Sequence, residues 1–332
     1  MPRGVPLTCA TLNLSWEANS TEELRQLKSR AFRNVPVKNR VAERAPDNNP
    51  FSRAYYRSAE TLLRAGPDII LLQEFSVPTS LVATSQDAID TTKRVLFKYK
   101  YVVVASKLIR VKGTLFGNMV LVSASKAALY DFVDLQDVDY YSYFEKDHRF
   151  SSGRPLAAAV MYEKGNLNSP TMLLCSAHSA HDMLWDYTHS QRTLSKIVAE
   201  SIAAYKQTIQ QPLPIDFSGM GVLFGGDLNT TLSNPCKWGG AVTIDVLGGT
   251  FTFYKAASSS VQQATLTTDK TKVPRDWIFC TSSVRAGCNP TVYVDPETGS
   301  DHYAVWAHTT AAMGGLAAFR KRAFVDVPGI CE

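Results

Sequence analysis

The sequence predicts a single α/β domain, because short apolar segments of strand length recur along the chain and alternate with helical patterns. The apolar segments are mostly continuous, which is typical of strands buried on both faces. They lie at 8–14, 68–73, 99–105, 118–123, 155–162, 171–177, 221–225, 276–280 and 303–307. Helical spacing is clear at 53–65, which ends at Gly66-Pro67, and at 188–207. No repeat or long linker divides the chain, so we expect one domain over residues 1–332.

Composition excludes several classes of protein. With 332 residues, 45% hydrophobic and 20% charged, the chain is neither disordered nor fibrous. No apolar run approaches the roughly 18 residues of a spanning helix, and the N-terminus lacks the apolar core of a signal peptide. The six cysteines show no zinc-like spacing and are expected to be free thiols. We therefore expect an intracellular protein, nuclear or cytoplasmic, with no membrane span, and the sequence leaves its oligomeric state open.

Positive charge is concentrated near the N-terminus. The net charge is +5, and ten Lys or Arg residues but only three acidic residues lie between Leu24 and Arg64, with aromatic residues interleaved. Such a basic insertion, around residues 17–60, can follow a phosphate backbone and stack bases. The alternative is a solvated helical face whose charge serves solubility.

Polar side chains able to bind metal or phosphate stand at the ends of apolar segments in five places. They are Asn13, Glu74 after 68–73, His178 after 171–177, the Gly225-Gly226-Asp227-Leu228-Asn229 sequence, and Ser300-Asp301-His302 before 303–307. Each has an ordinary explanation when taken alone, such as a turn, a cap or a hydrogen-bonded core histidine. Together they indicate a site at strand ends, where α/β folds place catalytic groups.

These motifs follow one another in a specific order. The order is Asn13, Leu72-Gln73-Glu74, His178-Ser179, Gly226-Asp227-Leu228-Asn229, Asp276-Trp277-Ile278-Phe279 and Ser300-Asp301-His302. In this order and at these separations the sequence resembles the endonuclease/exonuclease/phosphatase superfamily, which includes deoxyribonuclease I, over residues 12–306. The resemblance implies a four-layer α/β sandwich, in which two packed mixed β-sheets are flanked by helices.

The resemblance also implies catalytic roles. Asp227 is expected to orient or deprotonate the attacking water, with Asn229 beside it in the same turn. His302 is expected over the scissile phosphate, held by Asp276, and His178 resembles a second catalytic histidine.

Metal and substrate ligands are implied in the same way. Asn13, Glu74 and Asp301 resemble the residues that hold a divalent metal, with Glu74 as the principal ligand. Arg154 resembles a phosphate-contacting arginine, and Asn118 resembles the asparagine of a Gly-Asn near the second histidine, so both are assigned to substrate binding. Tyr143 lies in a tyrosine-rich stretch that either stacks a base or forms a surface loop.

Physical chemistry agrees with this assignment. The oxygen ligands of Glu74, Asn13, Asp301 and Asp227 suit a hard ion, Mg²⁺ or Mn²⁺, rather than zinc. Such an ion polarises a phosphoryl oxygen and stabilises a leaving oxyanion. A histidine paired with a carboxylate is fixed in one tautomer and can hold a proton near neutral pH.

The prediction is therefore a metal-dependent phosphodiester hydrolase, an intracellular DNA endo- or exonuclease. Leu14-Ser15-Trp16-Glu17 replaces the turn usual in abasic-site enzymes, and the 5-phosphatase pattern Pro-Ala-Trp-Cys-Asp-Arg is absent. A phosphatase or phosphodiesterase acting on a phosphoinositide, a sphingolipid or a tyrosyl-DNA adduct is the alternative within the enzyme class. A catalytically silent nucleic-acid-binding module is the alternative of another class.

Overall fold

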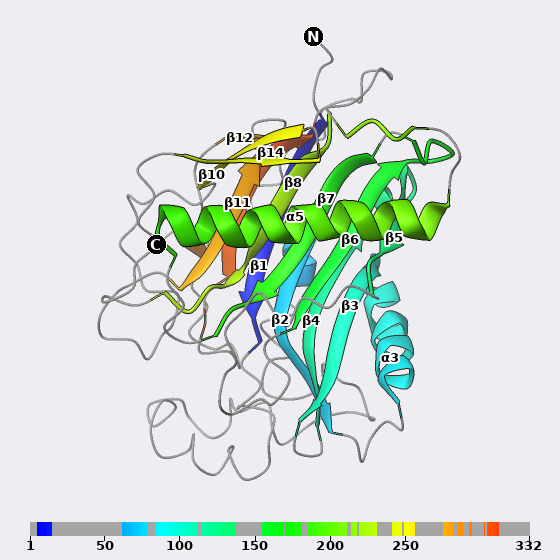
Figure 1. The fold of residues 1–332 in the computed structure, drawn as a ribbon. Helices are drawn as coiled ribbons and strands as arrows, with labels where there is room; N and C mark the ends of the chain where they lie inside the picture. The colour runs from blue at the N-terminus through cyan, green and yellow to red at the C-terminus, as the bar shows by residue number, and fades with distance from the viewer. Residues whose placement is uncertain are drawn as a thin grey trace.

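Two seven-stranded β-sheets pack face to face in the computed structural model (Figure 1). The structure describes residues 5–14, 62–78, 84–111, 114–136, 155–168, 170–180, 185–210, 214–217, 219–230, 241–247, 249–255, 275–281, 284–287, 292–293, 302 and 304–311. The single-domain prediction for 1–332 includes residues outside these ranges and stays a prediction. Among the described residues, no helix combines the length and the apolar character needed to cross a bilayer.

The first sheet has the strand order β12-β14-β1-β2-β4-β3, and β13 also pairs with β14. Its strands are β1 (Val5–Asn13), β2 (Ile69–Pro78), β3 (Tyr101–Val111), β4 (Thr114–Ser123), β12 (Val284–Gly287), β13 (Val292–Tyr293) and β14 (Ala304–Ala311). Strands β1 and β2 are parallel, and β1 pairs antiparallel with β14 on its other side. The sheet is therefore mixed, with its parallel pair in the interior.

The second sheet has the order β5-β6-β7-β8-β11-β10-β9. Its strands are β5 (Tyr130–Asp134), β6 (Leu156–Glu163), β7 (Pro170–His178), β8 (Gly221–Asp227), β9 (Ala241–Val246), β10 (Gly249–Lys255) and β11 (Asp276–Thr281). Among the described strands of this sheet, the parallel pair is β7 and β8, and it is again central. All nine residues of β7 are buried, as its continuous apolar sequence predicts.

Helices cover the outer face of each sheet. Helix α5 (Tyr187–Ile209) crosses the second sheet, begins at an Asp186 cap and ends at Gln210 in a left-handed conformation (Figure 1). Helix α3 (Ser85–Lys98) packs beside β3, and α4 (Ala124–Ala127) is a single turn after β4. Residues 62–65 are the described end of the predicted helix 53–65. The four-layer sandwich is therefore confirmed.

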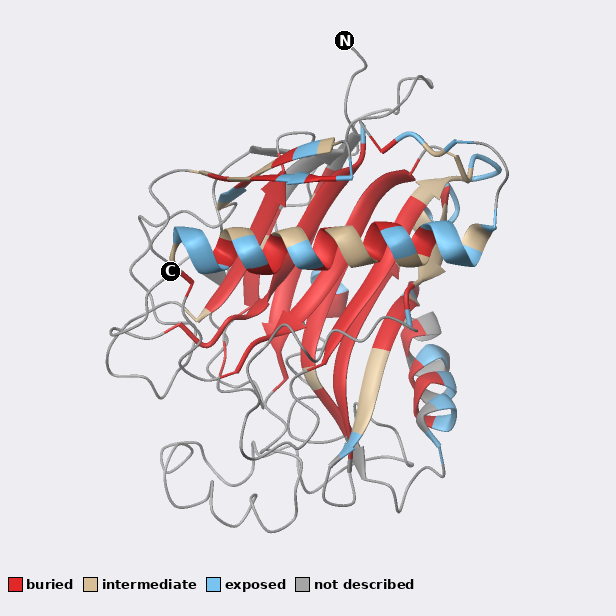
Figure 2. Cartoon of the chain, viewed as in Figure 1, coloured by how far each residue is buried: buried red, intermediate tan, exposed pale blue. Residues whose placement is uncertain are grey.

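The core has two parts, whose buried residues are among those coloured red in Figure 2. One cluster lies between the sheets and continues under α5, and it includes Leu7, Cys9 and Leu71 on the first sheet. The other, with Ala10, Leu72 and residues of α3, covers the outer face of the first sheet. Alternate residues of β1 and β2 thus face opposite layers, as the two-residue period of a strand requires. The described cysteines Cys9, Cys175 and Cys280 are free and buried, as expected.

Several elements differ from the sequence prediction. Helix α3 and strands β5, β9 and β10 were not predicted, and β9 alternates buried with less buried residues instead of running continuously apolar. The predicted segment 68–73 was wrong at its end, because β2 continues to Pro78 beyond a register shift between Leu72 and Phe75. The Ser/Thr-rich segment 256–272, predicted as loop or weak strand, lies outside the described residues.

Candidate active site

Strand register brings the predicted residues to one edge of the sandwich. Parallel pairing of β7 with β8 places His178 opposite Asp227, the last residue of each strand. Antiparallel pairing of β8 with β11 places Asp276, the first residue of β11, opposite the same Asp227. Asn13 ends β1 in register with Gln73, next to Glu74. His302 lies just before β14, which pairs with β1.

Unusual backbone conformations direct two of these side chains. Glu74 sits within the register shift of β2 and has a φ of 54°, so the bulge re-aims its carboxylate. Asn229 has a φ of 50°, a left-handed conformation that asparagine tolerates better than most residues. Left-handed residues often mark functional sites, where the surrounding structure holds them in place.

A glycine allows β7 and β8 to approach closely beside the site. Gly226 has a φ of 147°, and a Cβ atom built there would lie 1.8 Å from the carbonyl oxygen of Ala177. Only glycine fits such a contact. The Gly-Gly before Asp227 therefore has a packing role as well as a place in the sequence motif.

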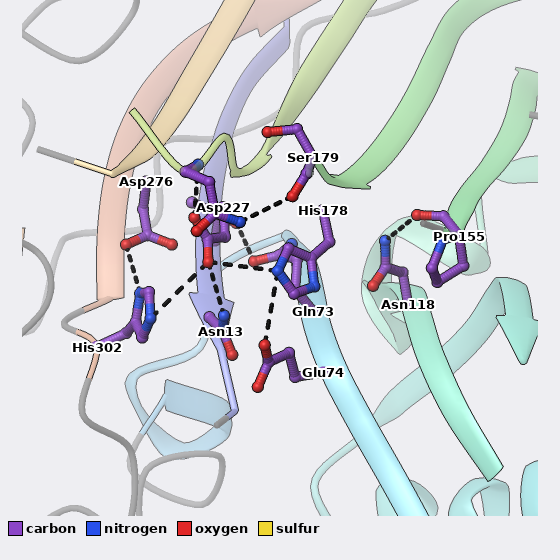
Figure 3. Close-up of polar contacts among 12 residues, drawn as sticks. Asn13, Gln73, Glu74, Asn118, Pro155, His178, Ser179, Asp227, Asp276 and His302 are labelled. Carbon is purple, nitrogen blue, oxygen red and sulfur yellow. Dashed lines mark hydrogen bonds and ion pairs between the residues drawn. The ribbon is translucent and has the colours of Figure 1, made fainter. Parts of the chain in front are cut away.

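Asp227 is at the centre of the site (Figure 3). Its Oδ2 accepts a hydrogen bond of 2.9 Å from Asn13 Nδ2, and its Oδ1 accepts one of 2.8 Å from the backbone N–H of Asn229. The Asn229 side chain donates to the carbonyl of Ser179 at 2.8 Å, which ties the turn after β8 to the end of β7. The carboxylate is thus held from two sides by groups that only donate to it.

Two histidines flank the Oδ2 atom of Asp227. The Nε2 atoms of His178 and His302 lie 3.6 Å and 3.8 Å from it. His302 Nδ1 lies 2.8 Å from Asp276 Oδ2, and both side chains are buried. This hydrogen bond fixes the His302 tautomer with Nδ1 protonated, and it points Nε2 toward Asp227.

The electrostatic environment of Asp227 disfavours its charged form. Burial raises the pKa of this carboxyl, and the negative charge of Asp276 raises it further. The positive charge of His302 and the hydrogen bonds from Asn229 and Asn13 act in the opposite direction without cancelling the increase in pKa. A buried carboxyl with a raised pKa is suited to exchange protons closer to neutral pH.

Glu74 lies on the other side of His178. Its Oε1 is 3.5 Å from His178 Nε2, and its side chain keeps 13% exposure, whereas that of Asp227 keeps 4%. Because Nδ2 of Asn13 donates to Asp227, its amide oxygen is turned toward the Glu74 side of the site (Figure 3). A carboxylate and an amide oxygen on the same side of the site are ligands that fit Mg²⁺ or Mn²⁺.

A second group of possible metal ligands is deeper. Donor atoms of Asp227, Asp276 and His302 all lie within 4.8 Å of one another, and all three residues are buried. The 2.8 Å contact from His302 Nδ1 to Asp276 is a hydrogen-bond distance. A metal bound through Nδ1 would have to break that bond, so this group fits a histidine–carboxylate pair beside a second carboxylate better than a metal cage.

Asn118 is near the site but uses its donors within the fold. Its Nδ2 donates to the carbonyls of Pro155 at 2.7 Å and Ser176 at 3.1 Å, and its side chain is fully buried. Both amide hydrogens are therefore engaged by backbone carbonyls. The centroid of the Phe116 ring, on the same strand, lies 6.2 Å from that of the His178 ring, and the two rings are tilted by 50°.

The structure therefore brings together seven of the predicted residues: Asn13, Glu74, His178, Asp227, Asn229, Asp276 and His302. Arg154, Tyr143, Asp301 and the whole basic insertion around 17–60 lie outside the described residues. Sequence reasoning missed Ser176, whose position two residues before His178 on a buried strand is the only signal that indicates it.

No protein-family model and no curated protein matches the sequence. Solved structures match nearly the whole chain. ANGEL2, a 2′,3′-cyclic phosphatase in complex with adenosine-2′,3′-vanadate, is 10% identical with a TM-score of 0.50, over 93% of this chain and 97% of that one. The human Nocturnin catalytic domain is 11% identical with a TM-score of 0.49, over 94% and 96%. An endonuclease/exonuclease/phosphatase from Bacteroides vulgatus is 13% identical with a TM-score of 0.46, over 92% and 98%.

At 10% identity the similarity to the ANGEL2 structure shows the fold alone. The chain has the fold of that structure, with the two packed mixed sheets that the resemblance in its sequence implied.

Proposed function

We propose that this protein is a metal-dependent phosphodiester hydrolase that acts on nucleic acid, with DNA as its first candidate substrate. The observation that supports this most is the Asp227 carboxylate, held by Asn13 and Asn229 between His178 and a His302–Asp276 pair. Hydrolysis of a phosphodiester needs a positioned water, a group that takes its proton, and positive charge near the phosphate. The site offers a residue type for each of these tasks.

Asp227 is the proposed group that orients the attacking water and accepts its proton. Its raised pKa makes it a stronger base than an exposed aspartate, and its fixed position prevents rotation away from the water. His302, once protonated, carries positive charge toward the phosphate while Asp276 balances that charge from behind. His178, between Glu74 and Asp227, can donate a second hydrogen bond to a phosphate oxygen.

Glu74 and Asn13 are the proposed metal ligands, together with Asp301. A Mg²⁺ or Mn²⁺ ion there would polarise a phosphoryl oxygen and neutralise charge on the leaving oxygen. The position of Glu74 at the exposed side of the site supports this assignment.

DNA is proposed because of the basic insertion around 17–60, whose charge can neutralise a phosphate backbone. In the sequence the insertion follows closely after Asn13, the last residue of β1. Arg154, Tyr143 and Asn118 remain proposed substrate-binding residues, Asn118 only if substrate binding rearranges its two hydrogen bonds. An intracellular location is likewise a proposal, supported by the free thiols of Cys9, Cys175 and Cys280.

The test is cleavage of a substrate panel in Mg²⁺, Mn²⁺ or chelator. The panel contains plasmid, duplex, single-stranded, abasic and 5′-tyrosyl DNA, RNA, and a 2′,3′-cyclic phosphate end, which is included because the ANGEL2 structure is described as a 2′,3′-cyclic phosphatase. Asp227→Asn should abolish metal-dependent turnover, while Asp245→Asn, which neutralises an exposed carboxylate of β9, should retain it.

Each outcome separates the candidate functions. Cleavage that is lost in Asp227→Asn and in chelator supports the proposal and ranks the substrates. If metal-loaded, folded protein cleaves no nucleic acid but releases phosphate from an inositol phosphate or a sphingolipid, the phosphatase alternative replaces it. Retained nucleic-acid binding with no turnover of any substrate points to the silent binding module.

A further inference from the structure

The contacts within the site run mainly between the two sheets. Asn13, Glu74 and His302 belong to the first sheet or its flank, and His178, Asp227 and Asp276 belong to the second. The Asn13–Asp227, Glu74–His178, His302–Asp227 and His302–Asp276 contacts therefore all cross from one sheet to the other. The geometry of the site depends on how far apart the sheets lie at this edge and on their relative alignment.

Apolar packing alone does not fix that spacing closely. The hydrophobic contribution is non-directional, so by itself it does not specify which atoms of the two sheets face one another. Leu7, Cys9, Ile69 and Leu71 fill the inter-sheet layer away from the site. Toward the site the inward positions of β1 and β2 become Thr11 and Gln73, which are polar and fully buried.

These polar residues meet Ser176 of the second sheet. Gln73 Nε2 donates to Ser176 Oγ at 2.9 Å, and Ser176 Oγ donates to the Leu72 carbonyl at 2.8 Å. The Ser176 carbonyl accepts from Asn118 Nδ2 at 3.1 Å. Thr11 Oγ1 donates to Gln73 Oε1 at 3.1 Å and so steadies the Gln73 amide. Ser176 is thus bound to two strands of the opposite sheet, β2 and β4.

We propose that Ser176 and Gln73 form an inter-sheet clamp that positions His178 against Glu74. Gln73 immediately precedes Glu74, and Ser176 lies two residues before His178 on the same face of β7. The hydrogen bond between Gln73 and Ser176 therefore sets the position of Glu74 relative to His178. Ser176 and Gln73 are positioning residues, since both are fully buried and act through their neighbours.

The test compares Ser176→Ala with Thr281→Val. Thr281 is also buried and accepts a hydrogen bond of 2.9 Å from the Val222 backbone, but it lies at the far end of β11 from Asp276. Both variants lose a buried hydroxyl and should lower the melting temperature. The clamp predicts that kcat of Ser176→Ala falls by about ten- to a hundredfold at nearly unchanged KM, because small misplacements at an active site cost rate. Thr281→Val should keep its kcat.

A double variant sharpens the result. Gln73→Leu combined with Ser176→Ala removes both partners of one hydrogen bond. Because each single change already breaks that bond, the fold-loss of kcat in the double variant should be smaller than the product of the two single fold-losses. Equal kcat in Ser176→Ala and Thr281→Val, at a temperature where both are folded, would overturn the clamp.

The inference rests on the proposed hydrolase function for its kinetic test, so a second readout is independent of turnover. The ring-proton NMR signals of His178 should move in Ser176→Ala and stay in place in Thr281→Val. If the wild-type protein hydrolyses nothing but the His178 signals move, the proposed function fails and the clamp stands. If the wild-type protein is active and the signals do not move, the clamp fails and the function stands.

Discussion

Replacing Asp276 by asparagine tests the His302–Asp276 pair with little change in shape. Asparagine fills the same volume, but it has no negative charge, and its amide nitrogen can donate to His302 Nδ1. The hydrogen bond at this position is 2.8 Å long between two buried side chains. A buried bond to a charged group contributes about 1.5–3 kcal/mol. At about 1.4 kcal/mol for each factor of ten, its loss alone lowers kcat by roughly 10- to 150-fold.

The tautomer sets the upper limit of the effect. If the new amide donates to Nδ1, the proton of neutral His302 moves to Nε2, the atom that faces Asp227. Reversal of a catalytic histidine's tautomer costs up to about 10⁴ in kcat. We therefore expect a fall in kcat of between about 10- and 10⁴-fold with little change in KM.

The assay is steady-state hydrolysis of the best substrate from the panel, beside thermal unfolding followed by circular dichroism. We expect the melting temperature at pH 7 to stay close to that of the wild type, because the change removes the repulsion between Asp276 and Asp227. Adding Asp276→Asn to His302→Ala should cause a much smaller loss than Asp276→Asn causes alone, since Asp276 acts mainly through His302. A folded Asp276→Asn protein with at least half of the wild-type kcat would refute the assignment.

Three further predictions follow from the described residues. Because burial and Asp276 raise the pKa of Asp227, wild-type activity should fall as pH drops through that raised pKa. In Asp276→Asn the acid limb of the pH–rate profile should move to lower pH; a move to higher pH would contradict the role of Asp276 in raising the pKa. Burial raises the pKa of Asp134 from 3.8 to about 6, so its contribution to stability is complete below pH 3.8 and is lost as pH rises through about 6. The free energy of unfolding of Asp134→Asn, measured in urea, should therefore exceed that of the wild type by about 1–2 kcal/mol at pH 7.5, after allowance for partial exposure, and the difference should be much smaller at pH 4. Gly226→Ala should lower the free energy of unfolding, measured in urea, by about 3 kcal/mol or more, because its Cβ would meet the Ala177 carbonyl oxygen at 1.8 Å and its φ is 147°. The control is Gly219→Ala, where the space around the Cβ is open; an equal loss in the two variants would contradict the prediction.

The sequence predicted the interior of the fold better than its edges. Central strands such as β7 and β8 are buried on both faces, so their apolar runs are continuous and easily recognised. Strand β9 lies at the edge of its sheet and alternates buried with less buried residues, and α3 has a largely polar surface. Their patterns are weaker because less of each element needs to be apolar.

The bulge at Glu74 also could not be predicted from the neighbouring residues in the sequence. The segment 68–73 ends its apolar run at Gln73, and the polar Glu74 predicts a strand end. The strand continues because its pairing with β4 resumes at Phe75, after the register shift. A pairing partner 42 residues further along the chain, Gly117, thus decides a feature that neighbouring residues do not indicate.

For the candidate site, the sequence by itself determined which residue types are present and at which strand ends they occur. Motif order identifies five of these residues, because each motif is a short stretch of sequence whose side chains define its chemistry: Asn13, Glu74, His178, Asp227 and His302. The tertiary structure decided which of them touch: parallel pairing sets His178 against Asp227, and the packing of two sheets sets Asn13 against the same carboxylate. The pKa of Asp227 and the inter-sheet bond of Ser176 depend on residues distant in sequence, so only the folded arrangement reveals them.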